Sequence, residues 1–234
     1  MTQQQLDKLS KGSYLKYSLE DNCVQETIAA RKLLCTARFD IYGILIYIDQ
    51  KVKGVKNLSW AKNIYKERTG AMTGNKMSEL GCDDKNTFDD FITVLDKLIE
   101  DFQNCRFDKE RTFIPVDKDY IPMDGAHRVA CAAYFGEQVN ILRFPDREYQ
   151  FKGYQYLKHE LLSTSISDYM ALESIRWYDD LYVFFLWPQA HQSADKLKKA
   201  QEMIYANTDV MYDVEYKFTY TATVSYTHLT LPTS

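Results

Sequence analysis

The segment Asp124-Gly125-Ala126-His127-Arg128 combines residue types that suit phosphate chemistry. A glycine permits a tight turn and lets the backbone approach a ligand closely. An arginine offers a forked cation that matches phosphate oxygens, and a histidine can donate a hydrogen bond or move a proton near neutral pH. A carboxylate can hold a divalent cation or orient a hydroxyl nucleophile. The segment therefore predicts a phosphate site.

The elements around this segment are expected to place it at a junction between a strand and a helix. Short extended runs at 113–116 and 120–123 contain prolines, which disfavour helix, and read as a hairpin or two neighbouring strands. The alanine-rich run 128–135 predicts a helix that Gly136 ends, and 139–144 predicts a strand. The first turn of such a helix offers free N–H groups and the positive end of its dipole, which attract anions.

A simpler interpretation of the same residues remains open. Asp124 could cap the helix while His127 and Arg128 lie on its solvated side, because short motifs often match by chance. Two features favour a ligand site instead. Strand-to-helix junctions are where α/β folds bind ligands, and an alanine-rich helix can pack closely behind such a site.

The segment IPVDKDYIPMDGAHRVACAAYFGEQVNILRF, within 113–144, resembles the core of the ParB/sulfiredoxin-like superfamily. In that superfamily two strands, a G-x-H-R or G-E-R-R loop, a helix and a strand form a nucleotide-phosphate site. Sulfiredoxins carry a reactive cysteine where this chain has Ala126, and ParB partition proteins carry G-E-R-R where it has residues 125–128. The D-G-x-H-R form is similar to the free-serine kinase branch, whose members phosphorylate a hydroxyl group using a nucleotide.

This resemblance implies roles for residues of the loop. Asp124 matches the catalytic or metal-organising carboxylate, and His127 and Arg128 match the phosphate-binding pair. Together with Gly125 and Ala126 they would form the nucleotide site. The expected cofactors are ATP or ADP with Mg²⁺, and Asp124 is the expected metal ligand.

The same branch uses a glutamate that precedes the loop as a general base. Glu79 is our first choice for this role, which would make Asp124, His127 and Glu79 the catalytic set, and Glu67 is our second. Lys85 could reach phosphate. The alternative for Glu79 is a solvated carboxylate in a loop.

Hydrophobic periodicity and turn residues predict the other elements. We expect helices at 25–36, 60–68, 88–102 with Thr87 as its cap, 167–177 capped by Ser167, and 193–205; a strand or a buried helix at 39–48; strands at 181–187 and 210–220; and a loop at 69–85. The fold class expected is α/β, with α+β possible: a strand-strand-helix-strand core, a helix-rich N-terminal region and a truncated C-terminal β-α-β lobe. The expected domains are 1–144, with its motif core at 113–144, and 145–223.

Composition narrows the classes of partner. The chain has 234 residues, 45% of them hydrophobic, and a net charge of −4, so it gives no overall attraction for nucleic acid or anionic membranes. No apolar run approaches the ~20 residues that span a bilayer. The odd number of cysteines, five, without C-x-x-C spacing, favours reduced structural thiols. We therefore expect a cytoplasmic protein whose partners are a nucleotide and a small molecule.

The last residues call for separate treatment. The string VSYTHLTLPT, at 224–233, matches the translation of a transposon-end sequencing adapter. We interpret residues from about 224 onward as a read-through artefact, exclude 224–234 from fold reasoning, and expect the natural chain to continue differently.

Three functional hypotheses follow from the sequence. The first is a nucleotide-dependent phosphotransferase, a small-molecule kinase that acts on a hydroxylated metabolite. The second is a non-catalytic nucleotide-sensing or nucleic-acid-binding module that uses the same loop. The third is a structural α/β domain in which the loop only caps a helix.

Overall fold

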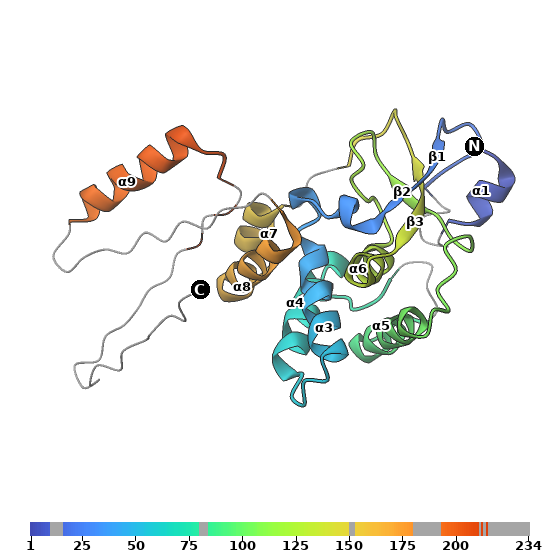
Figure 1. Ribbon diagram of the computed structural model, residues 1–234, viewed down its shortest axis with the longest axis horizontal. Helices are drawn as coiled ribbons and strands as arrows, with labels where there is room; N and C mark the ends of the chain where they lie inside the picture. Colours follow the sequence, from blue (N-terminus) through green and yellow to red (C-terminus); the bar gives the residue numbers. More distant parts are fainter. Residues whose placement is uncertain are drawn as a thin grey trace.

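The computed structural model describes residues 1–9, 16–79, 84–149, 153–179 and 193–210, together with Tyr212 and Val214. Its helices are α1 (Gln3–Asp7), α3 (Asp40–Val52), α4 (Ser59–Thr73), α5 (Phe88–Gln103), α6 (Ala126–Phe135), α7 (Tyr154–Glu160), α8 (Thr164–Ser174) and α9 (Ala194–Asn207). Single 3-10 turns are η1 (Ala30–Leu33), η2 (Thr36–Arg38) and η3 (Ile175–Trp177), and the strands are β1 (Val24–Ala29), β2 (Ile114–Val116) and β3 (Gln138–Arg143). Figure 1 shows the strands gathered next to α1, with α3, α4, α5 and α6 below them.

The strands form one sheet with the order β1-β3-β2. β1 pairs antiparallel with β3, so that Val24 lies opposite Arg143, and β2 pairs parallel with β3, so that Ile114 lies opposite Ile141. Parallel neighbours need a crossover connection, and α6 supplies it between β2 and β3. The loop that begins α6 therefore leaves the sheet beside its central strand.

Both faces of β3 are buried, as expected for a central strand. Val139 and Ile141 belong to the main hydrophobic cluster with α3 and α6, whereas Leu142 belongs to a second cluster on the other face. The second cluster consists of Leu6, Leu9, Tyr17, Phe113, Leu142 and Phe144. α1 thus covers the face of the sheet that α6 leaves open.

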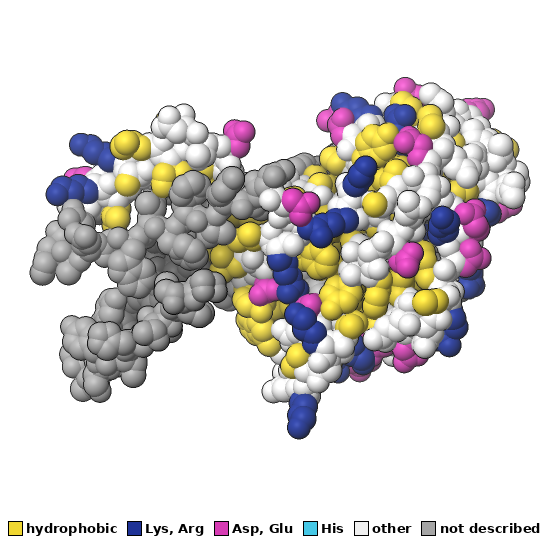
Figure 2. Space-filling view, viewed as in Figure 1, with side chains coloured by type: hydrophobic (Ala, Val, Ile, Leu, Met, Phe, Trp, Pro, Cys, Tyr) yellow, Lys and Arg dark blue, Asp and Glu magenta, His cyan; other side chains and the backbone are white. Residues whose placement is uncertain are grey.

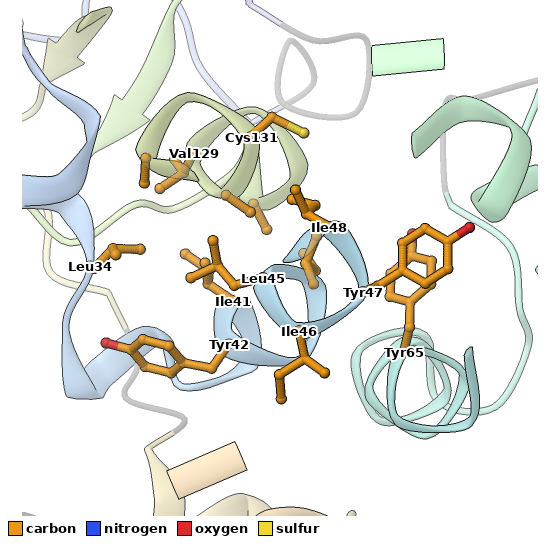
Figure 3. Close-up of a cluster of buried hydrophobic side chains, with 14 of the residues drawn as sticks. Leu34, Ile41, Tyr42, Leu45, Ile46, Tyr47, Ile48, Tyr65, Val129 and Cys131 are labelled. Atoms are coloured by element: carbon orange, nitrogen blue, oxygen red, sulfur yellow. The ribbon is translucent and has the colours of Figure 1, made fainter. Parts of the chain in front are cut away.

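Helix α3 lies at the centre of the main cluster, with α4 and α6 packed against it (Figure 3). All its residues from 40 to 48 are buried. A helix buried on every side has no polar face, so its hydrophobic pattern does not show the helical period. For this reason the sequence pattern of 39–48 fitted both a strand and a buried helix. The alternative of a buried helix is correct.

The helices expected at 88–102 and 128–135 are confirmed as α5 and α6. The side chain of Thr87 accepts a hydrogen bond from the Asp90 N–H, and the carboxylate of Asp90 accepts one from the Thr87 N–H, which completes a capping box. Gly136 ends α6 with φ +74°, in the left-handed region that favours glycine. Cys131 is fully buried in this helix and fills space, as expected.

Three sequence predictions need correction. Residues 25–36 form β1 and η1 rather than a helix, because β1 is held by β3 through contacts such as the 2.6 Å hydrogen bond from Thr27 Oγ1 to Asn140 Oδ1. α8 begins after Ser163, so Ser167 lies inside the helix and does not cap it. Part of the loop expected at 69–85 is helical, since α4 continues to Thr73.

The remaining predictions differ in how far the described residues cover them. The segment 120–123 makes a single bridge, from Pro122 to Val116, instead of a full strand, so the expected hairpin is reduced to a tight turn. The helix expected at 193–205 is confirmed as α9. The strand expected at 181–187, most of the one at 210–220, Cys82 and the tail at 224–234 lie outside the described residues.

The described chain mixes helices with a small sheet, so the expected α/β or α+β class is confirmed at that level. The boundary expected at residue 145 stays a prediction. α8 packs against α3, and Leu157, Ile166 and Met170 of α7 and α8 share the main cluster. No described helix is long and apolar enough to cross a membrane.

A buried ion-pair network joins α3, η2 and α4. Asp40 accepts two hydrogen bonds from Arg38, at 2.8 and 3.1 Å, and one from Arg68 Nη2, at 2.5 Å. All three residues are at most 5% exposed. Arg38 Nη1 also donates to the carbonyl oxygen of Pro122. The network therefore ties the segment that precedes α6 to the two central helices.

We expect Asp40→Asn to lower the free energy of unfolding by about 3–5 kcal/mol, because it leaves two buried guanidinium groups without their charge partner. Urea denaturation measures the change. The matched control is Asp101→Asn, which breaks an ion pair with Arg106 whose side chains are 34% and 58% exposed. Such a pair contributes about 0–1 kcal/mol. Equal losses in the two variants would contradict a dominant role for the buried network.

Candidate functional site

Gly125 directly precedes α6 and has φ +80°, in the left-handed region. The glycine is required by its backbone conformation, and a Cβ atom at this position would lie 2.9 Å from Arg128 Nη2, so a larger residue would displace the end of the arginine side chain. Gly125, not Asp124, is the N-cap residue. The interpretation in which Asp124 caps the helix is therefore wrong.

The guanidinium group of Arg128 lies beside the first turn of α6. Its Nη1 donates a 3.1 Å hydrogen bond to the carbonyl oxygen of Phe113, next to the start of β2. Arg128 thus adds a positive charge where the helix dipole is also positive, and it bridges the helix to the sheet.

His127 packs against two aromatic residues rather than lying on a solvated side. Its Nε2 atom is 2.6 Å from the hydroxyl oxygen of Tyr65 on α4, and its ring centroid is 6.3 Å from that of Phe91 on α5. Burial holds the pKa of His127 well below its usual value of 6.5, and the positive charges of Lys85 and Arg68 lower it further. The imidazole is therefore neutral at physiological pH.

Glu79 and Lys85 are neighbours of His127 and Tyr65. Lys85 Nζ lies 2.5 Å from Glu79 Oε2 and 5.3 Å from the centroid of the Phe91 ring. Burial raises the pKa of Tyr65, and the charge of Glu79 adds to this increase. The structure thus brings both residues chosen from the preceding loop close to the start of α6, with Glu79 in an ion pair.

The charge of Asp124 acts on three other residues. Burial raises the pKa values of Tyr17 and Tyr149, and the negative charge of Asp124 adds to both increases. Although burial opposes its charge, the pKa of Arg38 is raised because Asp40 and, to a smaller extent, Asp124 stabilise the guanidinium group. Asp124 is therefore close enough to Tyr17, Tyr149 and Arg38 for its charge to act on them.

Glu67, the second choice for a general base, has a different role. Its Oε2 atom accepts hydrogen bonds from the N–H and the hydroxyl of Ser163, at 3.2 and 2.8 Å, where α8 begins. Residues two apart on a helix do not face the same way, so Glu67 is turned away from Tyr65 and His127. The structure does not place Glu67 with the other candidates.

The residues around the start of α6 carry charges of both signs. The cations are Arg38, Arg68, Lys85 and Arg128, and the anions are Asp40, Glu79 and Asp124. Among the described residues no group of three or more His, Cys, Asp or Glu side chains could hold a metal ion. Chemically, the arrangement can bind an anion at the helix start, and Asp124 can contribute one carboxylate to a cation that arrives with it.

Sequence reasoning missed Arg38, Asp40, Tyr65 and Arg68. One signal was present: Arg38 and Asp40 stand at the edge of the continuous apolar run 41–48, where charged residues are drawn into the interior. Tyr65 and Arg68 gave no comparable signal. Their spacing of three places them on one side of a helix, but every helix contains such pairs, so the spacing does not mark a site.

No protein-family model, curated protein or solved structure matches this chain. The resemblance to the ParB/sulfiredoxin-like superfamily therefore stays a prediction carried by residues 113–144 alone.

The low pKa of His127 predicts a dependence of stability on pH. Below pH 6.5 the unfolded chain takes up a proton at this residue and the native chain does not. The free energy of unfolding should therefore fall as pH is lowered, by up to about 1.4 kcal/mol per pH unit from this group. The measurement is urea denaturation between pH 8 and about pH 5.

The comparison is with His127→Gln, whose amide oxygen can still accept a hydrogen bond from Tyr65. This variant should lose stability less steeply with falling pH than the wild type. Identical slopes would mean that His127 titrates equally in the native and unfolded chains.

Proposed function

We propose that this protein is a nucleotide-dependent phosphotransferase, a small-molecule kinase that acts on a hydroxylated metabolite and holds phosphates at residues 124–128. The observation that carries this proposal is the gathering of positive charge at the start of α6. Arg128 lies over Gly125, and the charges of Lys85 and Arg68 reach His127. This environment suits a phosphate group, which helix N-termini and guanidinium groups both attract.

Each residue has a role in this proposal. Arg128, neutral His127 and the first N–H groups of α6 bind the phosphates, and Lys85 adds a further cation. Asp124 would hold Mg²⁺, which, when bound, neutralises charge on the transferred phosphoryl group. A single carboxylate fits this metal, since Mg²⁺ is usually bound by one or two carboxylates together with substrate phosphates. Positioning and charge stabilisation then supply the rate.

Glu79 would accept the proton of the substrate hydroxyl. Its ion pair with Lys85 occupies the carboxylate in the ligand-free chain. A phosphate group that attracts Lys85 would release Glu79, so that binding the nucleotide would prepare the base. Lys85 would thus exchange Glu79 for the phosphate, and this exchange would couple nucleotide binding to the release of the base.

The same ion pair favours a second candidate function. If Lys85 stays with Glu79, the loop has a phosphate site without a base, as in a non-catalytic nucleotide-sensing module. Nucleic acid is a less suitable ligand, because on the face shown in Figure 2 the described Lys and Arg side chains are interspersed with Asp and Glu. Nucleotide binding without turnover would identify this second function.

The experiment that tests the proposal combines the full chain with Mg²⁺ and ATP or ADP across a panel of hydroxylated metabolites, and measures consumption of the nucleotide. Consumption that depends on one metabolite supports the kinase. If the nucleotide binds but no metabolite causes its consumption, the result favours the sensing module. If the nucleotide does not bind, the result contradicts both the kinase and the sensing module.

Asp124→Asn should lower turnover on the order of a hundredfold or more, because the amide keeps the shape of the side chain but removes the charge that would hold Mg²⁺. The steady-state rate with saturating nucleotide measures the effect. Asp119→Asn is the matched control, since Asp119 is exposed in the turn before the loop. Retained turnover in Asp124→Asn would remove Asp124 from the mechanism.

Gly125→Ala and Gly136→Ala separate stability from binding at the two ends of α6. Both residues have positive φ, so each alanine should cost about 1–2 kcal/mol of stability. Only at Gly125 would the new methyl group displace Arg128; at Gly136 a Cβ atom meets nothing within 4 Å. We expect ADP affinity, measured by calorimetry, to fall at least tenfold in Gly125→Ala alone. Equal affinities in the two variants would argue against Arg128 as a phosphate ligand.

A further inference from the structure

Tyr65 and His127 form a short polar contact between α4 and the start of α6. Tyr65 is fully buried on α4, where its ring stacks on that of Tyr47 with centroids 5.7 Å apart (Figure 3). Its hydroxyl oxygen lies 2.6 Å from His127 Nε2, and the two rings meet edge to face. The contact fixes the imidazole ring between α4 and α5.

The distances indicate which group donates the proton. The Tyr65 hydroxyl has one proton, and the acceptors in its reach include His127 Nε2 at 2.6 Å and the Phe91 carbonyl oxygen at 3.4 Å. A separation of 2.6 Å is shorter than N–H···O bonds usually are, whereas hydroxyl donors form shorter bonds, down to about 2.5 Å when the acceptor is oxygen. The distance of 3.4 Å is longer than such bonds usually are. Tyr65 therefore donates to His127.

The Phe91 carbonyl does not need the Tyr65 proton. Phe91 lies inside α5, where each carbonyl oxygen accepts the N–H four residues later. A donation from Tyr65 to Phe91 would leave His127 Nε2 to supply the proton of the shorter bond, which its length disfavours. The backbone arrangement thus agrees with the direction inferred from the distances.

The surroundings of His127 leave the ring with one proton. Burial and three cations, Lys85, Arg68 and Arg128, oppose a charged imidazole, whereas Asp40 favours the charge. Asp40 is itself bound by two arginines. A neutral ring that accepts a hydrogen bond at Nε2 must carry its proton at Nδ1.

We infer that Tyr65 is a positioning residue that holds His127 in the neutral tautomer with its proton on Nδ1, so that His127 acts on a bound anion only as a hydrogen-bond donor. The part that concerns ligand binding rests on the proposed function. With Nε2 engaged, His127 does not accept a proton from a substrate, and that task falls to Glu79. Of the two roles that the sequence allowed for His127, donating a hydrogen bond and moving a proton, the inference keeps only the first.

The tautomer can be measured directly by NMR on the ¹⁵N-labelled full chain. Two-bond ¹H–¹⁵N correlation spectra distinguish protonated from unprotonated ring nitrogens, and comparison with His127→Gln identifies the signals of His127. We expect Nδ1 to be protonated and Nε2 to be unprotonated between pH 8 and pH 6.

Two tyrosine variants test the part played by the hydroxyl. Tyr65→Phe keeps the stacked ring but removes the donor, so the Nε2 signal should shift and the tautomer with its proton on Nε2 should gain population. Tyr47→Phe is the matched control. It removes a hydroxyl from the same aromatic stack, but that hydroxyl bonds Asp96 Oδ1 at 2.8 Å. It should leave the His127 signals unchanged.

Binding of ADP, measured by calorimetry, gives an independent reading. We expect Tyr65→Phe to weaken it about tenfold and Tyr47→Phe to leave it unchanged, with urea denaturation verifying that both variants fold. A protonated Nε2 in the wild type, or His127 signals that do not respond to Tyr65→Phe, would overturn the inference. Equal ADP affinity in Tyr65→Phe and wild type would overturn the positioning role. If the wild type does not bind ADP, the proposed function fails, while the NMR result still decides the tautomer.

Discussion

The structure depends on one buried carboxylate held between two guanidinium groups. Asp40 begins the central helix, Arg38 precedes it and Arg68 comes from α4, and Arg38 also binds the Pro122 carbonyl just before the candidate loop. Charges removed from water in this way are stable only as a complete set, because the loss of one leaves the others uncompensated. The position of the loop relative to α4 is therefore set by the same interaction that joins the central helices.

The network also determines the electrostatics of the candidate site. Two guanidinium groups and one carboxylate leave an excess positive charge in a medium of low dielectric constant, where charges interact over longer distances than in water. The charge of Arg68 lowers the pKa of His127, and the charge of Asp124 adds to the raised pKa of Arg38. The excess positive charge of the network would thus stabilise a phosphate group at the start of α6 without direct contact with it.

The local signals at the ends of α5 and α6 predicted their structure correctly. Thr87 with Asp90 marked the start of α5, and Gly136 marked the end of α6, because caps involve only neighbouring residues. β1 was missed because its partner β3 lies far along the chain, and propensity yields to such pairing. The same difference between local and distant contacts applies to the candidate site. The sequence indicated the segment 124–128, whereas the residues that orient it come from three other segments and become its neighbours only in the folded chain.

Helix α6 is bracketed by two glycines in the left-handed conformation and contains ten residues. Because consecutive residues on a helix are rotated by about 100°, one extra residue between these stops would swing His127 away from Tyr65 or detach Arg128 from Phe113. The number of residues in this helix is thus as constrained as their identity. Insertions and deletions should be tolerated in the exposed connections of the chain but not between Gly125 and Gly136.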